Sequence, residues 1–280
     1  MANGRITINQ IKSMKQKGEK ITMLTAYDYS TAQIIDKVGV PLILVGDSLG
    51  MVVLGYDSTI PVTMEDMVHH AKAVVRGTQH TLIVGDLPFM TYHVSTEDAL
   101  RNAARFIQEA GTHAVKLEGG VTVADKVQRI VECGIPVMGH IGLTPQSIHQ
   151  FGGHKAQGKS PEAAIRILED ARALEQAGAF AVVLETVPAP LATLVSQKLT
   201  IPTIGIGAGA GCDGQVQVIN DLLRSYTDFV PRHAKQYAKL SEISANAITE
   251  YYNEVKAGTF PTEKQSLNMD EGILEELKDK

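Results

Sequence analysis

Short apolar segments alternate with helix-like segments along most of this chain. Short runs rich in β-branched residues are typical of strands buried on both faces, as in a parallel sheet covered by helices. Regular alternation of such strands with helices requires that the strands run parallel. The strand-like segments are residues 21–26, 42–47, 82–86, 114–118, 136–140, 179–185, 203–206 and 228–230.

The number of these units predicts a closed barrel. Eight strand–helix units in about 230 residues favour a (β/α)8 TIM barrel, an α/β fold, over an open, doubly wound sheet. The open sheet stays as the alternative, because segment 228–230 is only weakly strand-like. Helices are predicted at residues 29–38, from 63 onward, and at 95–111, 123–132, 160–177, 188–198, 214–223 and 234–255.

Composition limits the class of protein. The 280 residues are expected to form a single barrel domain, 1–280, with a polar tail at 260–280 that packs on the surface or on a neighbouring subunit. The net charge of −5 without a basic block argues against a nucleic-acid partner. No apolar run is long enough to span a membrane, and no secretory-type segment is recognised, so a cytoplasmic location is expected. Cys133 and Cys212 lack metal-binding spacing, and Cys133 is expected to be buried.

Five of the strand-like segments end in charged or imidazole side chains. Burying such groups is costly unless a partner or a metal compensates them. In a TIM barrel, the carboxyl ends of all strands meet at one mouth, which is where the active site lies. The side chains that this places at the mouth are Asp47, Asp86, Lys116, Glu118, His140 and Glu185.

The acids suggest a metal site. Asp47 and Asp86 end neighbouring strands in the same Gly-Asp context, and two carboxylates brought together repel unless a cation lies between them. A set of oxygen ligands without cysteine favours Mg²⁺. Glu118 could be a further ligand or could hold a metal-bound water. The alternative is that these acids cap loops or pair with arginines.

The remaining mouth residues allow more than one role. Lys116 and Glu118 are two apart and therefore share one face of the strand, which we expect to be the inner face. Lys116 could bind a substrate carboxylate or phosphate, form a Schiff base, or pair with Glu118. Glu185 ends a long apolar run; desolvation makes a carboxylate a stronger base, so Glu185 is the best candidate for a general base, with counter-ion of Lys116 as the alternative. His140 could bind a substrate oxygen, orient an acid, or be purely structural.

A glycine-rich segment follows the seventh strand. Gly209, Gly211 and Gly214 match the GxGxxG pattern of dinucleotide-binding loops. That pattern belongs in the first unit of a Rossmann domain rather than in the seventh unit of a barrel, where glycine-rich turns can bind phosphate. The favoured interpretation is a tight turn that lets the backbone approach a ligand, without a nucleotide.

Seven motifs in order give the chain a specific resemblance. It is similar to the ketopantoate hydroxymethyltransferase family from about residue 7 to residue 261. The motifs are TAYD (25–28), VGDSLG (45–50), GDLPF (85–89), VKLEGG (115–120), GHIGLTPQ (139–146), LETVP (184–188) and IGIGAG (204–209).

The resemblance implies an activity and a set of residue roles. It implies a barrel of the phosphoenolpyruvate mutase/isocitrate lyase group and Mg²⁺-dependent transfer of a hydroxymethyl group from 5,10-methylenetetrahydrofolate to 3-methyl-2-oxobutanoate, giving ketopantoate in pantothenate biosynthesis. It also implies a homo-oligomer, a decamer in this family. By similarity, the metal positions are Asp47, Asp86 and Glu118, the substrate contacts are Asp47, Ser48, Asp86, Lys116 and, for orientation or the product alkoxide, His140, and the proton acceptor is Glu185.

Two other functions stay open at this point. One is a Mg²⁺-dependent lyase of oxo acids in the same barrel group, although such lyases carry a reactive cysteine near the mouth that neither cysteine here provides. The other is a barrel kept as a binding or assembly module, which would be expected to have lost one or more of the mouth residues.

Overall fold

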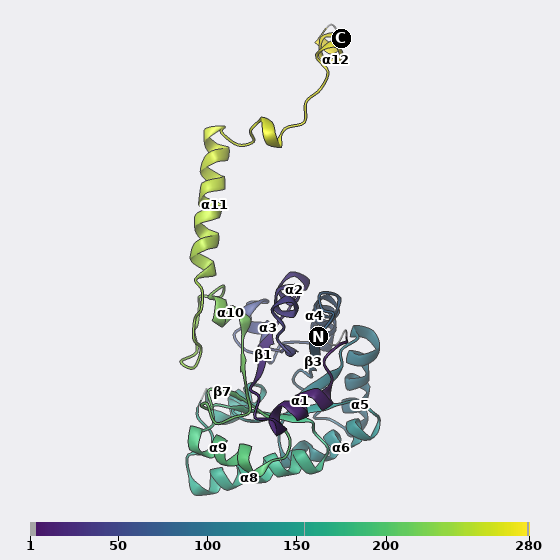
Figure 1. Cartoon of the computed structure of the whole chain (residues 1–280), viewed down its shortest axis with the longest axis vertical. Helices are drawn as coiled ribbons and strands as arrows, with labels where there is room; N and C mark the ends of the chain where they lie inside the picture. Colours follow the sequence, from purple (N-terminus) through teal and green to yellow (C-terminus); the bar gives the residue numbers. More distant parts are fainter. Residues whose placement is uncertain (1–3, 154, 279) are drawn as a thin grey trace.

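The computed structural model describes residues 4–153, 155–278 and 280, and its core is a closed parallel barrel (Figure 1). Each strand pairs in parallel with the next one along the chain, and the last strand pairs with the first. The predicted barrel is therefore confirmed, and the open sheet is excluded. The strands are β1 (Ile21–Thr25), β2 (Leu42–Val45), β3 (Leu82–Asp86), β4 (Ala114–Glu118), β5 (Val137–Gly142), β6 (Ala181–Glu185), β7 (Thr203–Ile206) and β8 (Gly214–Gln217).

Alternate residues of each strand point to opposite sides of the barrel wall. On β2, Leu44 belongs to the cluster inside the barrel, whereas Ile43 packs in the layer between the strands and the helices. On β4, Val115 and Leu117 likewise pack outward. The two-residue period of a strand then directs every second residue into the barrel. The inward series is apolar through most of the barrel and becomes polar at the carboxyl ends.

The amino end of the barrel is closed by the first helix. Helix α1 (Ile8–Gln16) begins with a capping box between Thr7 and Gln10. Its fully buried Ile11 packs in the interior cluster with Met23 and Leu42. The amino end of the barrel is thus filled by packed side chains.

Helices surround the barrel, and hydroxyl side chains cap the starts of several of them. Thr63, Ser95 and Ser160 each accept a hydrogen bond from the backbone N–H three residues on, at the starts of α4, α5 and α8. The surrounding helices are α2 (Tyr29–Val38), α3 (Leu49–Val52), α4 (Met64–Arg76), α5 (Thr96–Arg105) continued by a π-helical turn (Phe106–Ala110), α6 (Ala124–Glu132), α7 (Ile148–Phe151), α8 (Pro161–Gln176), α9 (Ala189–Lys198) and α10 (Ile219–Leu223).

The eighth strand differs from the prediction. Residues 228–230 form no strand; β8 is Gly214–Gln217, which lay at the start of a predicted helix. Its sequence, GQVQ, has no apolar run. Only its inward face is buried: Val216 faces the barrel interior, whereas Gln215 on the other face is exposed to solvent. Only seven residues, 207–213, separate β7 from β8, and they form turns in place of a helix. Pairing with β1 and β7, rather than composition, makes this segment a strand.

The C-terminal part extends away from the barrel (Figure 1). Helix α11 (Leu240–Ala257) begins six residues later than predicted, and α12 (Glu271–Lys278) follows it. Cys133 is exposed at the end of α6, so its expected burial was wrong, whereas Cys212 is buried. In the described part of the chain, no helix combines the length and apolarity needed to cross a membrane.

Gly85 makes one position of the barrel wall sensitive to a single methyl group. A Cβ atom at residue 85 would lie 2.4 Å from Cδ1 of the buried Phe106 ring. We predict that Gly85→Ala lowers the free energy of unfolding by about 1–3 kcal/mol, because the ring and strand must move apart. Urea unfolding measures this. The double variant Gly85→Ala/Phe106→Leu should recover part of the loss, and additive effects would contradict the proposed clash.

Candidate active site

The predicted site residues all line one cavity at the carboxyl mouth of the barrel. Its volume is about 430 Å³. Asp47 and Ser48 follow β2, Asp86 and Glu185 end β3 and β6, and the others lie on β4 and β5. Asp86, Lys116, Glu118, His140 and Glu185 continue the inward-facing series of their strands, which explains why they converge. Asp47 is out of step with the inward-facing Leu42 and Leu44, and it lines the cavity because the chain turns after β2. The cavity lining includes Asp47, Ser48, Asp86, Lys116, Glu118, His140 and Glu185.

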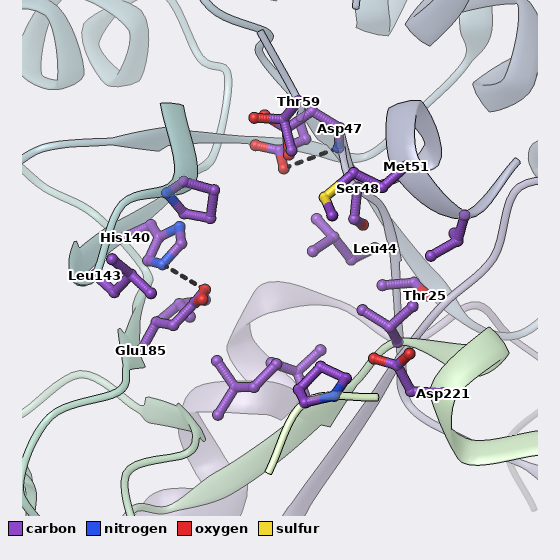
Figure 2. A pocket seen from close by; sticks show the side chains of 18 of the residues that line it. Thr25, Leu44, Asp47, Ser48, Met51, Thr59, His140, Leu143, Glu185 and Asp221 are labelled. Atoms are coloured by element: carbon purple, nitrogen blue, oxygen red, sulfur yellow. Dashed lines mark hydrogen bonds and ion pairs between the residues drawn. The ribbon is translucent and has the colours of Figure 1, made fainter. Parts of the chain in front are cut away.

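A line of polar contacts crosses the site from Asp86 to Glu185. Lys116 Nζ lies 2.8 Å from Asp86 Oδ1 and 3.2 Å from His140 Nδ1. On the other side of the imidazole, His140 Nε2 lies 3.2 Å from Glu185 Oε2 (Figure 2). Within the described residues, the ion pair of Lys116 is with Asp86, so neither Glu118 nor Glu185 is its counter-ion.

Lys116 is held in its charged form. Burial on its own would lower the pKa of the ammonium group, but the charges of Asp86, Glu118 and Asp47 outweigh burial and raise that pKa well above its usual value. A charged amine cannot attack a carbonyl group. This argues against the Schiff-base alternative and leaves Lys116 as a binding site for an anion.

His140 is kept neutral. Burial, and then the charge of Lys116, lower the pKa of its imidazole, although Glu185 acts in the opposite direction. The contacts fit a neutral ring that carries its proton on Nε2, facing Glu185, and accepts at Nδ1 from Lys116. Nε2 lies 3.2 Å from the carboxylate without a well-aligned hydrogen bond, so His140 is placed to orient Glu185 once the two groups align.

The acids exceed the cations in this cavity. Burial raises the pKa values of Asp47, Asp86 and Glu118, and mutual repulsion adds to this, while Lys116 acts against it. Asp86 Oδ2 accepts a hydrogen bond from the Asp47 backbone N–H at 3.3 Å, which brings the two aspartates together. A bound cation would relieve this repulsion, so the donor set fits a hard divalent ion.

The carboxylates of the cavity fit a metal ion that takes only some of its ligands from the protein. Among the described residues, no three His, Cys, Asp or Glu side chains form a group arranged to hold a metal ion. Mg²⁺ typically uses only one or two carboxylates and completes its octahedron with water and substrate. Two aspartates, with Glu118 as a third ligand or in contact with a metal-bound water, are compatible with this coordination of Mg²⁺.

Two residues without a predicted role, Gln146 and Tyr92, position the acids. The buried Gln146 side chain donates to Asp47 Oδ2 at 2.8 Å and accepts from the Tyr92 hydroxyl at 2.6 Å, and its backbone N–H donates to Glu118 Oε2 at 3.1 Å. The Tyr92 hydroxyl in turn accepts from the Glu118 backbone N–H. Gln146 lies in the GHIGLTPQ motif, so the motif could have indicated that Gln146 belongs to the site. Nothing in the sequence indicated Tyr92.

We predict that Tyr92→Phe lowers the free energy of unfolding by about 1–3 kcal/mol, because it leaves buried polar groups of Gln146 and Glu118 without a partner. It should also slow turnover, since Gln146 then orients Asp47 less well. Urea unfolding and steady-state rates measure the two effects. The control Tyr56→Phe removes an exposed hydroxyl and should change stability by less than about 0.5 kcal/mol. Equal stability of the two variants would contradict the prediction.

Three further residues at the cavity have informative surroundings. Ser48, half-buried before α3, lies 2.8 Å from the Tyr27 hydroxyl through its Oγ atom and can donate to a ligand. Thr59 is buried and its hydroxyl has no hydrogen-bond partner among the described residues. Asp221, on α10, lies across the cavity from Glu185 (Figure 2). No motif or strand end marked Thr59 or Asp221 in the sequence.

The glycine-rich segment has a packing role. A Cβ atom on Gly209 would lie 2.4 Å from the Cβ atom of Ala189, so glycine lets the turn between β7 and β8 press against α9. Gly214 of the GxGxxG match lies within β8 rather than at a helix start. This agrees with the expected tight turn and does not fit a dinucleotide-binding loop.

Comparison with known sequences places the whole barrel in one family. The sequence model described as ketopantoate hydroxymethyltransferase matches residues 5–263. The 3-methyl-2-oxobutanoate hydroxymethyltransferase of Dehalococcoides mccartyi (strain ATCC BAA-2266 / KCTC 15142 / 195) is 66% identical over 274 residues, which cover 98% of this chain and 97% of that protein.

Solved structures share the fold at low identity. A 2,3-dimethylmalate lyase, described as a member of the PEP mutase/isocitrate lyase superfamily, superposes with a TM-score of 0.56 at 14% identity and covers 98% of this chain and 99% of its own. A phosphonopyruvate hydrolase in complex with oxalate and Mg²⁺ gives a TM-score of 0.59 at 11% identity, with 98% and 95% covered. The barrel is thus of the type predicted.

Proposed function

The chain belongs to the ketopantoate hydroxymethyltransferase family, and from this membership we propose how the residues of its cavity carry out the reaction. The enzyme transfers a hydroxymethyl group to 3-methyl-2-oxobutanoate and forms ketopantoate, the activity that its relatives' names state. The observation that carries the proposal is the line of contacts from Asp86 through Lys116 and His140 to Glu185, because it puts an anion-binding group and a base at the two ends of one site.

We propose Mg²⁺ as the metal, held by Asp47 and Asp86 with Glu118 as a further ligand or bound to a metal-bound water. The excess of buried carboxylates supports this, as does the structural neighbour described with oxalate and Mg²⁺, since oxalate resembles the end of a 2-oxo acid. When bound, Mg²⁺ supplies Lewis acidity, which draws electron density from the ketone oxygen and acidifies the C3–H bond of the oxo acid.

The protein groups bind the oxo acid and move its proton. The Lys116 ammonium neutralises the substrate carboxylate, and the Ser48 hydroxyl donates to it. Glu185, held by His140, removes the C3 proton, and the electron pair of the broken C–H bond remains on the substrate as an enolate. His140 thus acts by orienting the base, with contact to the product alkoxide as its other proposed role.

We propose 5,10-methylenetetrahydrofolate as the one-carbon donor. The enolate carbon forms a bond to the methylene carbon, water supplies the hydroxyl group of the product, and both carbon–nitrogen bonds that hold the methylene carbon to the folate break. The two folate nitrogens take up the proton removed from C3 and one proton of the water, which leaves tetrahydrofolate. The cavity is larger than a five-carbon oxo acid needs, which supports the presence of a second reactant.

The test is isotope exchange. With Mg²⁺ in D₂O, the enzyme should exchange the C3 proton of 3-methyl-2-oxobutanoate without folate and should form ketopantoate when 5,10-methylenetetrahydrofolate is added. Calorimetry should show that Asp47→Asn and Asp86→Asn abolish Mg²⁺-dependent binding of the oxo acid, whereas the surface control Asp125→Asn binds normally. Unchanged affinity in the aspartate variants would refute the metal proposal.

We also propose that the enzyme is a homo-oligomer, a decamer by resemblance to its family. Support comes from α11, whose residues are all exposed in the single chain except the half-buried Ser241. Its large apolar side chains are three to five residues apart and lie on one side of the helix, where they form a stripe that a soluble helix normally buries. The stripe, defined by Leu240, Ile243, Ile248, Tyr251 and Val255, is proposed to pack against a second copy of the chain.

We predict that Ile248→Glu shifts the protein to smaller species in sedimentation velocity, because a charge would have to be buried in the contact. The control Thr249→Glu changes the next residue of the same helix, outside the stripe, and should sediment like the unmodified protein. A monomeric unmodified protein, or equal effects of the two substitutions, would contradict the proposal.

A further inference from the structure

One side of the cavity is lined by residues that have no assigned role in the proposed reaction. It is formed by β1, β8 and the segments after β8, across from His140 and Glu185 (Figure 2). Its wall is largely apolar and includes Val216, Val218, Tyr226 and Pro231. The oxo acid occupies the opposite side, where Lys116 and the aspartates lie. This second side is therefore available for another ligand.

Asp221 is the acid on this side, and it lacks a partner. It lies in α10 and is only 5% exposed. Within residues 4–153, 155–278 and 280, no hydrogen bond or ion pair involves its carboxylate, although its position on the cavity is plain (Figure 2). Burial alone raises the pKa of the Asp221 carboxyl to about 6. The carboxylate lines the cavity without a donor from the described residues, so it is open to a ligand that supplies hydrogen-bond donors.

The chemistry of the two reactants decides which ligand this is. The oxo acid is an anion without N–H donors and is unsuited to a carboxylate. The one-carbon donor of the proposed function has a flat pterin ring, whose ring N–H and neighbouring 2-amino group point the same way. This edge resembles a guanidinium group, which carboxylates bind through two parallel hydrogen bonds.

We propose that Asp221 binds the pterin ring of the folate co-substrate by accepting hydrogen bonds from its N3–H and 2-amino groups. The ring lies against the apolar wall that includes Val218 and Tyr226. Because Asp221 and Glu185 face each other across the cavity, the oxo acid and the folate approach from opposite sides. This assignment rests on the proposed function, since it takes the folate donor from it.

The test uses Asp221→Asn, which keeps the shape and replaces one acceptor by a donor that opposes the pterin N–H groups. The KM for 5,10-methylenetetrahydrofolate should rise roughly 10- to 100-fold, and calorimetric binding of tetrahydrofolate should weaken equally. The KM for the oxo acid and the folate-independent exchange of its C3 proton should stay at wild-type values. The variant without ligands should melt at a higher temperature, because an unpaired buried charge is gone.

A matched control separates binding from stability. Asp66 occupies the same third helical position in α4, but it accepts hydrogen bonds from Thr63 away from the cavity. Asp66→Asn should therefore melt at a lower temperature and leave the KM for the folate unchanged.

The possible outcomes distinguish the two proposals. An unchanged KM for the folate in Asp221→Asn, or a lower melting temperature with loss of both exchange and transfer, would overturn the role of Asp221 while the proposed function stands. Absence of exchange and transfer in the wild-type enzyme would instead remove the proposed function, and the pterin assignment with it.

Discussion

Glu185→Gln should reduce the rate of C3 proton exchange in 3-methyl-2-oxobutanoate by about 10²- to 10⁴-fold, the usual contribution of a positioned general base. Glutamine keeps the size of the side chain and can still contact His140 Nε2, which lies 3.2 Å from the carboxylate in the wild type. It cannot accept a proton at neutral pH. Exchange is measured by NMR in D₂O with Mg²⁺ and without folate.

Two further measurements make this prediction specific. Binding of the oxo acid to Glu185→Gln should stay close to wild type, because Lys116 and Ser48, rather than Glu185, are the proposed contacts of the substrate carboxylate. A variant of the residue that orients the base, His140→Asn, should retain more exchange than Glu185→Gln. Exchange by Glu185→Gln at the wild-type rate would show that another group removes the proton.

The barrel and the convergence of its polar strand ends could be predicted because both follow from local patterns. The apolar runs give the strands, and the two-residue period carries the inward direction of Leu82 and Val84 forward to Asp86. β8 could not be predicted in the same way. Its half-exposed GQVQ segment is a strand because β1 and β7 are aligned on either side, which composition does not reveal.

The contacts between site residues depend on residues far apart in the sequence. Gln146 and Asp47 are 99 positions apart, and Tyr92 and Gln146 are 54 apart. Only the closure of the barrel brings them together. Sequence patterns therefore placed the strand-end acids and Glu185 at one cavity but left the partner of Lys116 open. They did not reveal the isolated carboxylate of Asp221, which lies beyond the last strand on a short helix.

Replacing Lys116 by methionine is expected to lower the free energy of unfolding by about 3–5 kcal/mol, the usual loss when one partner of a buried ion pair is removed. Lys116 and Asp86 are each less than 5% exposed, and Asp47 and Glu118 add negative charge around them. Without the ammonium group these carboxylates repel one another. Urea unfolding without metal measures the loss.

Magnesium makes the Lys116 prediction a test of the whole site. If Asp47 and Asp86 bind Mg²⁺, the ion should stabilise Lys116→Met more than the wild type, because it then relieves repulsion that no protein cation offsets. The control Lys126→Met breaks a surface pair with the exposed Asp125 and should cost less than about 1 kcal/mol, with no added response to Mg²⁺. Equal stabilisation of all three proteins would mean that the ion binds outside the cluster of acids, and the roles proposed for the two aspartates would then be wrong.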